Sequence, residues 1–232
     1  MVRGISMTES GNRVYPAGRL VPVFCANDHV RAAELTLALA QTSAEAGESV
    51  LLVDCQNGEL MNCAGVTYDV SMADVLFGSA AFAEAKYVTS HENFTAIAAG
   101  AASLDSVLGS LAALSLDYDW VFIGTPTGCT PGHIRLAGAA DMSLLAYDSC
   151  MDNFMRAYWM IDACRQRYPR FDPLLLSIGD ADAAEETSKI LIKEISTFLG
   201  APPPYMGHMD NPEFIDEILI SLQRAEPVTS AA

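Results

Sequence analysis

Positive charge, metal-ligand spacings and long apolar runs are all scarce in this sequence. Its 13 Lys and Arg side chains stand against 29 Asp and Glu, which leaves a formal charge of -16. Such an excess repels phosphate backbones and anionic lipid head groups. The charge balance therefore argues against a nucleic-acid partner, including a DNA-partition role, and against binding at a membrane surface.

The cysteines and histidines lack the spacings that are typical of metal sites. The six cysteines include no CxxC pair, and the four histidines form no HxxxH or HExxH motif. No charged-then-apolar signal segment opens the chain, and no apolar run approaches the roughly 18 residues that span a bilayer. We therefore expect reduced thiols in a cytoplasm, no metal, no cofactor and no direct membrane insertion.

Length and composition predict one packed domain with short extensions. The chain has 232 residues, of which 51% are hydrophobic and 18% charged, and this balance favours a folded core. We predict a flexible leader at 1–18, an α/β domain at 19–211, and a C-terminal helix with a disordered tail at 212–232. Glu213, Asp216 and Glu217 oppose anionic lipid, so we expect that helix to dock on a partner or on its own chain.

Short apolar runs alternate with segments of helical period. The predicted strands are 20–25, 49–54, 94–98, 120–123, 142–147 and 174–178. The predicted helices are 29–46, 72–77, 80–87, 103–115, 153–168, 183–199 and 211–223. Continuously apolar strands separated by helices predict a doubly wound, mostly parallel α/β sheet with helices on both faces, in three layers.

Five strings, in order, resemble the MinD/ParA family of deviant Walker P-loop ATPases. They are AEAGESVLLVD at 44–54, MADVLFG at 72–78, FTAIAAG at 94–100, DYDWVFIGTPTG at 117–128 and AAD at 139–141. The family includes the flagellar-number regulator FlhG, the pilus-positioning protein CpaE and CpsD-type tyrosine kinases. The resemblance covers roughly residues 20–211 and implies a P-loop NTPase-like fold.

The segment that matches the family's phosphate-binding loop has lost its defining residues. That loop has the pattern KGGxGK[ST], in which glycines let backbone N–H groups wrap the phosphates. Counting back from Gly47, the matching positions are Asn27, Asp28, His29, Arg31, Ala32 and Ala33. Side chains at the glycine positions block close backbone approach, and Asp28 adds negative charge. No shift of register restores the loop, because no glycine or lysine lies between Arg19 and Gly47.

Other positions that the resemblance assigns to the nucleotide site have changed as well. Asp54 is retained, but Gln56 replaces the second acidic residue of the switch, and Gly124 replaces the aspartate that helps to hold Mg²⁺. The family's base-binding asparagine falls near Ser177 or Ile178. Together these changes predict a degenerate pseudo-ATPase.

We interpret the chain as a non-catalytic, protein-binding regulator or adaptor that controls a bacterial surface machine, namely a flagellum, a pilus or a polysaccharide exporter. Its expected partners are proteins: a second copy of the chain, an active relative or a membrane-machine component that recruits it to the inner membrane or the cell pole. A divergent ATPase or CpsD-like kinase remains the alternative, as does a repurposed site around Asp54, Cys129 and His133.

One stretch of the sequence is open to two interpretations. It is rich in aromatic residues and methionine, and comprises Met151, Met155, Tyr158, Trp159 and Met160. Such side chains are common at protein interfaces. They are also typical of a helix that covers a sheet, so both a docking surface and core packing remain open.

Overall fold

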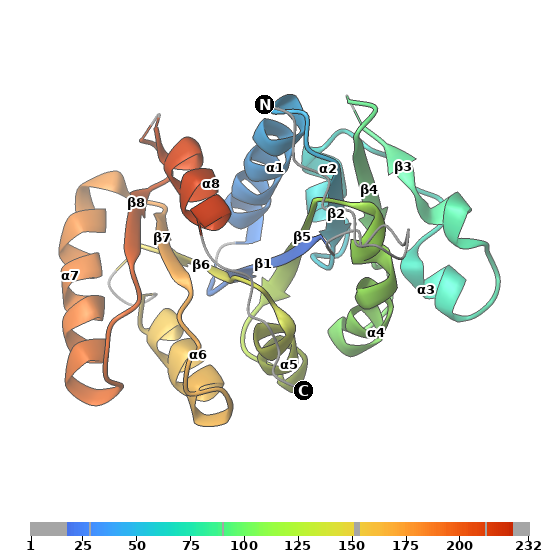
Figure 1. Ribbon diagram of the computed structural model, residues 1–232. Helices are drawn as coiled ribbons and strands as arrows, with labels where there is room; N and C mark the ends of the chain where they lie inside the picture. The colour runs from blue at the N-terminus through green and yellow to red at the C-terminus, as the bar shows by residue number, and fades with distance from the viewer. Residues whose placement is uncertain (1–17, 28, 90, 151–153, 212, 225–232) are drawn as a thin grey trace, which may run out of the picture.

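The computed structural model describes residues 18–27, 29–89, 91–150, 154–211 and 213–224. In these residues the strands form one eight-stranded sheet with the order β3-β4-β2-β5-β1-β6-β7-β8 (Figure 1). The strands are β1 Arg19–Cys25, β2 Val50–Asp54, β3 Tyr87–Val88, β4 Phe94–Ala98, β5 Trp120–Thr127, β6 Leu144–Asp148, β7 Leu174–Ile178 and β8 Tyr205–His208. Neighbouring strands are parallel except β3 and β4.

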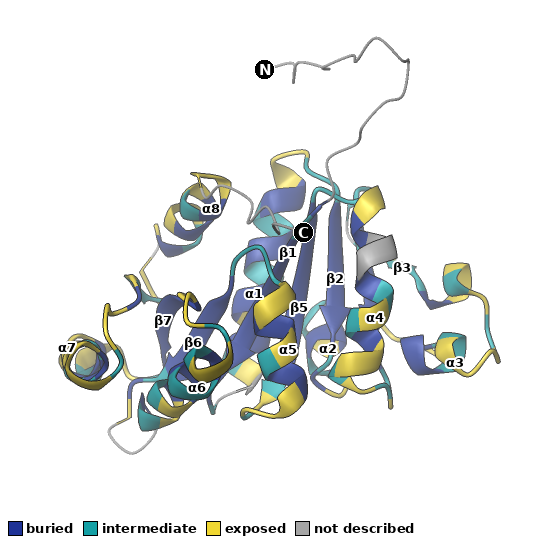
Figure 2. Cartoon of the chain, turned by 60° about the horizontal axis from the view of Figure 1, so that its bottom comes forward, coloured by how far each residue is buried: buried dark blue, intermediate teal, exposed yellow. Residues whose placement is uncertain are grey.

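Helices cover both faces of the sheet. They are α1 His29–Glu45, α2 Glu59–Cys63, α3 Met72–Leu76, α4 Leu104–Leu114, α5 Pro131–Ala139, α6 Phe154–Arg167, α7 Ala181–Phe198 and α8 Phe214–Arg224. Helices α1, α2 and α8 pack on one face, and α3 to α7 contribute to the core on the other. Figure 2 shows the strands buried between helices whose outer sides are exposed. The predicted doubly wound, three-layer α/β fold is confirmed.

Strand β2 shows why this sequence forms a two-sided sheet. All five of its residues are buried. Because side chains alternate along a strand, Val50 and Leu52 join the core under α1, while Leu51 and Val53 join the core under α4 and α5. A strand with only one apolar face would leave one of these two cores open to water.

Two of the predicted elements are wrong. Residues 80–87 do not form a helix: Phe82–Ala85 makes a single 3-10 turn, and Tyr87–Val88 forms β3, antiparallel to β4. The Tyr87 hydroxyl accepts hydrogen bonds from the backbone N–H groups of Asp69 and Val70, which holds this segment at the sheet edge. Strand β5 was also predicted too short, since its pairing with β1 carries it on to Thr127.

Three elements were not predicted at all. Helix α2 has five residues, helix α5 begins with Pro131 and contains two glycines, and β8 has only four residues. Short elements carry too little hydrophobic period to be detected in the sequence. They form because the sheet supplies the surface against which they pack.

The C-terminal helix packs on its own domain. Phe214, Ile218 and Leu222 of α8 are fully buried in the core that α1 and α2 share. Arg19 donates a hydrogen bond to the Leu222 carbonyl and lies 5.2 Å from the centre of the Trp120 ring. Residues 1–17 of the predicted leader and residues 225–232 of the predicted tail lie outside the described residues. No helix in the described part of the chain is both long and apolar enough to cross a membrane.

Candidate functional site

The carboxyl ends of the parallel strands meet at one edge of the sheet, where ligands bind in folds of this class. The connection from β1 to α1 lies at the centre of this edge and contains just residues 26–28. Ala26 is buried, and the Asn27 side-chain oxygen accepts a hydrogen bond from the Asp148 backbone N–H at 3.0 Å. Asp28 lies outside the described residues. The connection therefore runs directly from strand to helix and is tied to the end of β6.

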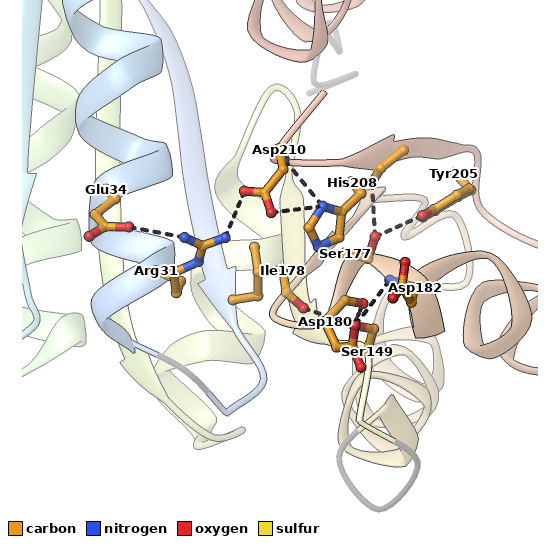
Figure 3. Close-up of polar contacts among 11 residues, drawn as sticks. Arg31, Glu34, Ser149, Ser177, Ile178, Asp180, Asp182, Tyr205, His208 and Asp210 are labelled. Atoms are coloured by element: carbon orange, nitrogen blue, oxygen red, sulfur yellow. Dashed lines mark hydrogen bonds and ion pairs between the residues drawn. The ribbon is translucent and has the colours of Figure 1, made fainter. Parts of the chain in front are cut away.

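The remaining residues of the predicted degenerate loop belong to α1. His29 begins the helix, and Ala32 and Ala33 are fully buried in the core beneath it. Arg31 points away from the β1–α1 connection and forms an ion pair with Asp210, at 2.9 Å from Nη2 to Oδ1 (Figure 3). Neither alanine has a functional group for a phosphate or Mg²⁺, and the guanidinium is held by a carboxylate from the β8–α8 connection.

Asp54 is a capping residue for the short helix α2. Its Oδ1 accepts the Gln56 backbone N–H at 2.6 Å, and its Oδ2 accepts the Met61 backbone N–H at 2.9 Å. The side chain is buried, and burial raises the pKa of Asp54, although hydrogen bonds from backbone N–H groups oppose that rise. Both carboxylate oxygens are engaged by backbone donors, which accounts for an aspartate at this position without a ligand.

Gln56 and α2 fill the space above Gly124. A Cβ atom placed on Gly124 would lie 2.9 Å from Leu60 Cδ2 and 3.0 Å from Gln56 Oε1. The Gln56 Nε2 donates to the Thr125 carbonyl at 3.0 Å, which fixes the amide across the end of β5. The Gln56 Oε1 is buried and has no hydrogen-bond partner among the described residues. A side chain at position 124 would therefore require Leu60 and Gln56 to move.

The ends of β7 and β8 are joined by hydrogen bonds, although the buried His208 Nε2 has no partner among the described residues (Figure 3). Ser177 is fully buried, and its hydroxyl lies 2.7 Å from the Tyr205 hydroxyl and 3.2 Å from the Gly207 carbonyl. Ile178, the other residue considered for base recognition, is fully buried and apolar. The His208 Nδ1 accepts the Asp210 backbone N–H at 3.2 Å. Side chains here bind one another, and neither Ser177 nor Ile178 has an amide to read a base.

His133 caps helix α5. Its Nδ1 lies 3.2 Å from the Thr130 backbone N and 2.8 Å from the Thr130 hydroxyl oxygen, while its Nε2 lies 2.9 Å from the Pro126 carbonyl oxygen. A carbonyl only accepts, so Nε2 carries the proton and Nδ1 accepts from the Thr130 N–H. Burial lowers the pKa of His133. Both ring nitrogens are thus engaged in the cap, and neither is left to activate Cys129.

Two cavities open at this edge. One of about 270 Å³ has Cys129 and Trp159 in its wall, and one of about 530 Å³ includes Asn57, Asp105 and Arg135. In the second cavity, Arg135 is bound by the Asp105 carboxylate. No group of three or more His, Cys, Asp or Glu side chains that could hold a metal ion occurs among the described residues.

Comparisons with known proteins identify the fold. No protein-family model and no curated protein sequence matches the chain. The cell division ATPase MinD of Pyrococcus furiosus matches with a TM-score of 0.63 and 19% identity, over 88% of this chain and 99% of that one. The fold is that of the MinD-type ATPases. MinD of Aquifex aeolicus matches with a TM-score of 0.65 and 16% identity, over 91% and 89% of the two chains.

Kinase domains share the same MinD-type fold. The kinase domain of the Escherichia coli tyrosine kinase ETK matches with a TM-score of 0.55 and 16% identity, over 64% of this chain and 63% of that one. At these identities the similarity concerns the fold. What the MinD-type fold does in this chain depends on the side chains at its carboxyl edge.

Sequence reasoning missed several residues of this edge. It identified Asp54, Gln56 and Gly124 separately, but gave no sign that Gln56 lies against Gly124. It also missed Asp210, whose partner Arg31 lies 179 positions away. No periodicity connects such distant positions. In the aromatic and methionine-rich stretch, for which a docking surface and core packing were both open, Met160 is buried, Met155 and Tyr158 are partly buried and Trp159 is 61% exposed, while Met151 lies outside the described residues.

Proposed function

We propose that this chain is a pseudo-ATPase of MinD-type fold that acts by binding other proteins, as a regulator or adaptor that positions or controls a bacterial surface machine. The resemblance to FlhG, CpaE and CpsD-type proteins supplies the machines: a flagellum, a pilus or a polysaccharide export and synthesis system. The partner is then a second copy of the chain, an active relative or a component of the machine.

The observation that carries this proposal is the filled space above Gly124. The Gln56 amide oxygen and Leu60 Cδ2 lie closer than van der Waals contact to the position that a Cβ at residue 124 would take, at 3.0 and 2.9 Å. The adjacent β1–α1 connection has no glycine, and Ala32 and Ala33 are buried beneath it. A triphosphate needs bare backbone donors and positive charge. Ala26 and Asn27, the described residues of this connection, carry no positive charge, and the Arg31 guanidinium is paired with Asp210.

The proposal of a protein partner is supported by one structural neighbour, which is found in a complex with another protein. A structure of the Aquifex aeolicus cell division proteins MinC and MinD in complex matches this chain with a TM-score of 0.62 and 17% identity. In our chain the net charge of -16 disfavours nucleic acid and anionic membranes as partners, which leaves protein surfaces as the better match.

Calorimetric titration tests whether the chain has lost the ability to bind a nucleotide. The full chain is titrated with ATP and with ADP, each with and without Mg²⁺, and we expect no saturable heat up to about 1 mM ligand, a binding free energy weaker than about -4 kcal/mol. The Asp54→Ala variant is the matched control, because Asp54 is the one acidic position of the predicted switch that is retained. Micromolar binding, with ATP turnover that Asp54→Ala abolishes, would overturn the proposal.

Trp159 offers a direct test of protein binding. Its side chain is 61% exposed at the carboxyl edge, and tryptophan is enriched at interaction hot spots. Phe198 is 68% exposed near the end of α7 and serves as the control. In affinity capture from the native bacterium, Trp159→Ala should lose the specific partner by at least about tenfold, while Phe198→Ala retains it. Equal recovery with both variants would exclude this surface.

An alternative function is a divergent ATPase or tyrosine kinase with a non-standard nucleotide site. It is favoured by the match to kinase domains, which include that of BceF, with a TM-score of 0.53 and 21% identity. Incubation with γ-labelled ATP and Mg²⁺ decides between the two functions. Label on a tyrosine of this chain supports the kinase, whereas absence of label and of nucleotide binding supports the pseudo-ATPase.

A further inference from the structure

A small cavity opens at the carboxyl edge of the sheet, between two strand–helix connections and the first turns of α6. Its volume is about 270 Å³. The β1–α1 connection, the β5–α5 connection and α6 all contribute to its wall. The wall residues are Ala26, Gly128, Cys129, Arg156, Trp159 and Met160. Arg156 supplies the only charged side chain of this wall.

The volume of the cavity limits the size of its occupant. An apolar cavity of about 150 Å³ holds a benzene ring, whereas pockets for small-molecule ligands measure about 300–1,000 Å³. At about 270 Å³ the cavity fits one large aromatic or branched side chain. It therefore suits an anchor residue of another protein better than a nucleotide or another cofactor.

The α6 part of the wall consists of residue types that protein interfaces favour. Trp, Met and Arg are all enriched at interfaces, and Arg156, Trp159 and Met160 supply one of each. Positions three and four apart lie on one face of a helix, so α6 presents these side chains together. Met160 is buried and Trp159 is exposed. The cavity thus combines a fixed apolar contact with an aromatic ring that a partner can reach.

Backbone hydrogen bonds fix the opposite wall of the cavity. The Ala26 N–H donates to the Ala146 carbonyl at 2.9 Å, and the Gly128 N–H donates to the Cys25 carbonyl at 3.3 Å. Both connections are therefore tied to the ends of strands. A wall that is already ordered loses little conformational entropy when a partner side chain enters.

Arg156 differs from the other arginines near helix starts at this edge. Arg31 in α1 is paired with Asp210, and Arg135 in α5 is paired with Asp105. Arg156, in the first turn of α6, is exposed and has no ion pair among the described residues. A cation beside an apolar cavity complements a carboxylate beside an apolar anchor.

We propose that this cavity binds a short segment of a partner protein in which an aromatic or branched aliphatic anchor lies within two positions of an Asp or Glu. The anchor fills the cavity against Met160 and the Trp159 ring, and the carboxylate pairs with the Arg156 guanidinium. The excess of 29 acidic over 13 basic side chains repels a continuously acidic segment, so the segment carries one or two carboxylates. This inference rests on the proposed protein-binding function and defines the chemistry of the partner at one site.

Selection from a displayed library of random heptapeptides on the full chain tests this chemistry. We expect the enriched peptides to share an aromatic or aliphatic residue within two positions of an Asp or Glu. The most enriched peptide is then synthesised and titrated into the chain. Tryptophan fluorescence provides the signal, because the chain has two tryptophans, of which Trp120 is 5% and Trp159 61% exposed. A peptide side chain over the Trp159 ring should shift its emission to shorter wavelength.

Variants of the cavity wall locate the binding. Arg156→Gln should weaken the peptide about tenfold, and Cys129→Phe, which places a ring at the cavity, should abolish binding. Arg170→Gln and Cys150→Phe are the matched controls, because both residues are exposed and neither lies in the cavity wall. Both controls should bind the peptide as the wild type does.

The outcomes separate this site from the proposed function. Enriched peptides without an acidic residue, or no enriched peptide, would overturn the site, as would a peptide whose affinity is unchanged by Cys129→Phe and Arg156→Gln. The proposed function fails on a different result, which is micromolar binding of ATP in calorimetry. A chain that binds no nucleotide and captures a partner insensitive to both variants keeps the proposed function and loses this site.

Discussion

Introducing an aspartate at position 124, where the MinD/ParA resemblance implies one, tests whether the space above Gly124 is filled by Gln56 and Leu60. In the native chain Leu60 Cδ2 and Gln56 Oε1 lie 2.9 and 3.0 Å from where a Cβ would be. Both atoms are the ends of flexible side chains, so a single methyl group displaces them at modest cost. A carboxyl group needs additional space and a hydrogen-bond donor, and the buried Gln56 Oε1 offers only a second acceptor.

The expected cost of Gly124→Asp follows from two terms. Crowding a packed interior costs about 1–3 kcal/mol. A buried carboxyl group without a partner adds about 1–3 kcal/mol, and it is expected to protonate to avoid a larger cost. We expect a total loss of about 3–5 kcal/mol, against about 1 kcal/mol for Gly124→Ala, which introduces the crowding alone.

Urea denaturation followed by circular dichroism measures this difference. With an m value of about 3 kcal/mol/M, Gly124→Asp should lower the midpoint by about 1 M or more. In the double variant Gln56→Ala/Gly124→Asp the cost should fall by about 1–2 kcal/mol, because the two side chains compete for one space. Additive effects would refute the reasoning, as would a stable Gly124→Asp chain that binds Mg²⁺ and ATP.

Three further predictions concern other parts of the fold. Gln56→Glu should cost about 2 kcal/mol in urea denaturation, because a carboxylate replaces the donor to the Thr125 carbonyl; an unchanged midpoint would contradict that contact. The contribution of His133 to stability should be full above about pH 6.5 and be lost as pH falls through its lowered pKa, since the unfolded chain then binds a proton that the native ring excludes. Urea midpoints at about pH 8 and pH 5 should therefore converge in His133→Gln relative to the wild type, and an equal pH dependence would show that another group is responsible. Phe214→Ala should cost about 3–5 kcal/mol because its side chain is fully buried under α8, whereas Ile220→Ala, on the exposed side, should cost less than about 1 kcal/mol; similar midpoints for both variants would contradict the docking of α8.

The sequence predicted elements that are long or continuously apolar. Residues 29–46 predict α1, which is observed as His29–Glu45, and 94–98 and 174–178 match β4 and β7. These predictions succeed because the hydrophobic period is a local property that any sheet-covering helix or buried strand must show. The resemblance to the MinD/ParA family also predicted the fold. The strings that carry it lie at the strands and their ends, and they can be recognised locally in the sequence.

Elements that depend on side-chain contacts from outside their own segment could not be predicted. The segment 80–87 has helical composition, yet its end pairs with β4 and its Tyr87 hydroxyl is fixed by the backbone at Asp69 and Val70. Helix α2 forms one turn because the Asp54 carboxylate accepts backbone N–H groups at its start. In both cases a contact with another part of the chain outweighs local propensity.

The sequence by itself determined the α/β class, the positions of the main strands and helices, and the absence of any glycine or lysine between Arg19 and Gly47. Only the tertiary structure decided that Gln56 lies over Gly124 and that Arg31 binds Asp210. The physical reason is that periodicity and composition act over a few residues, whereas a site is made where strand ends that are far apart in the chain meet at one edge of a sheet.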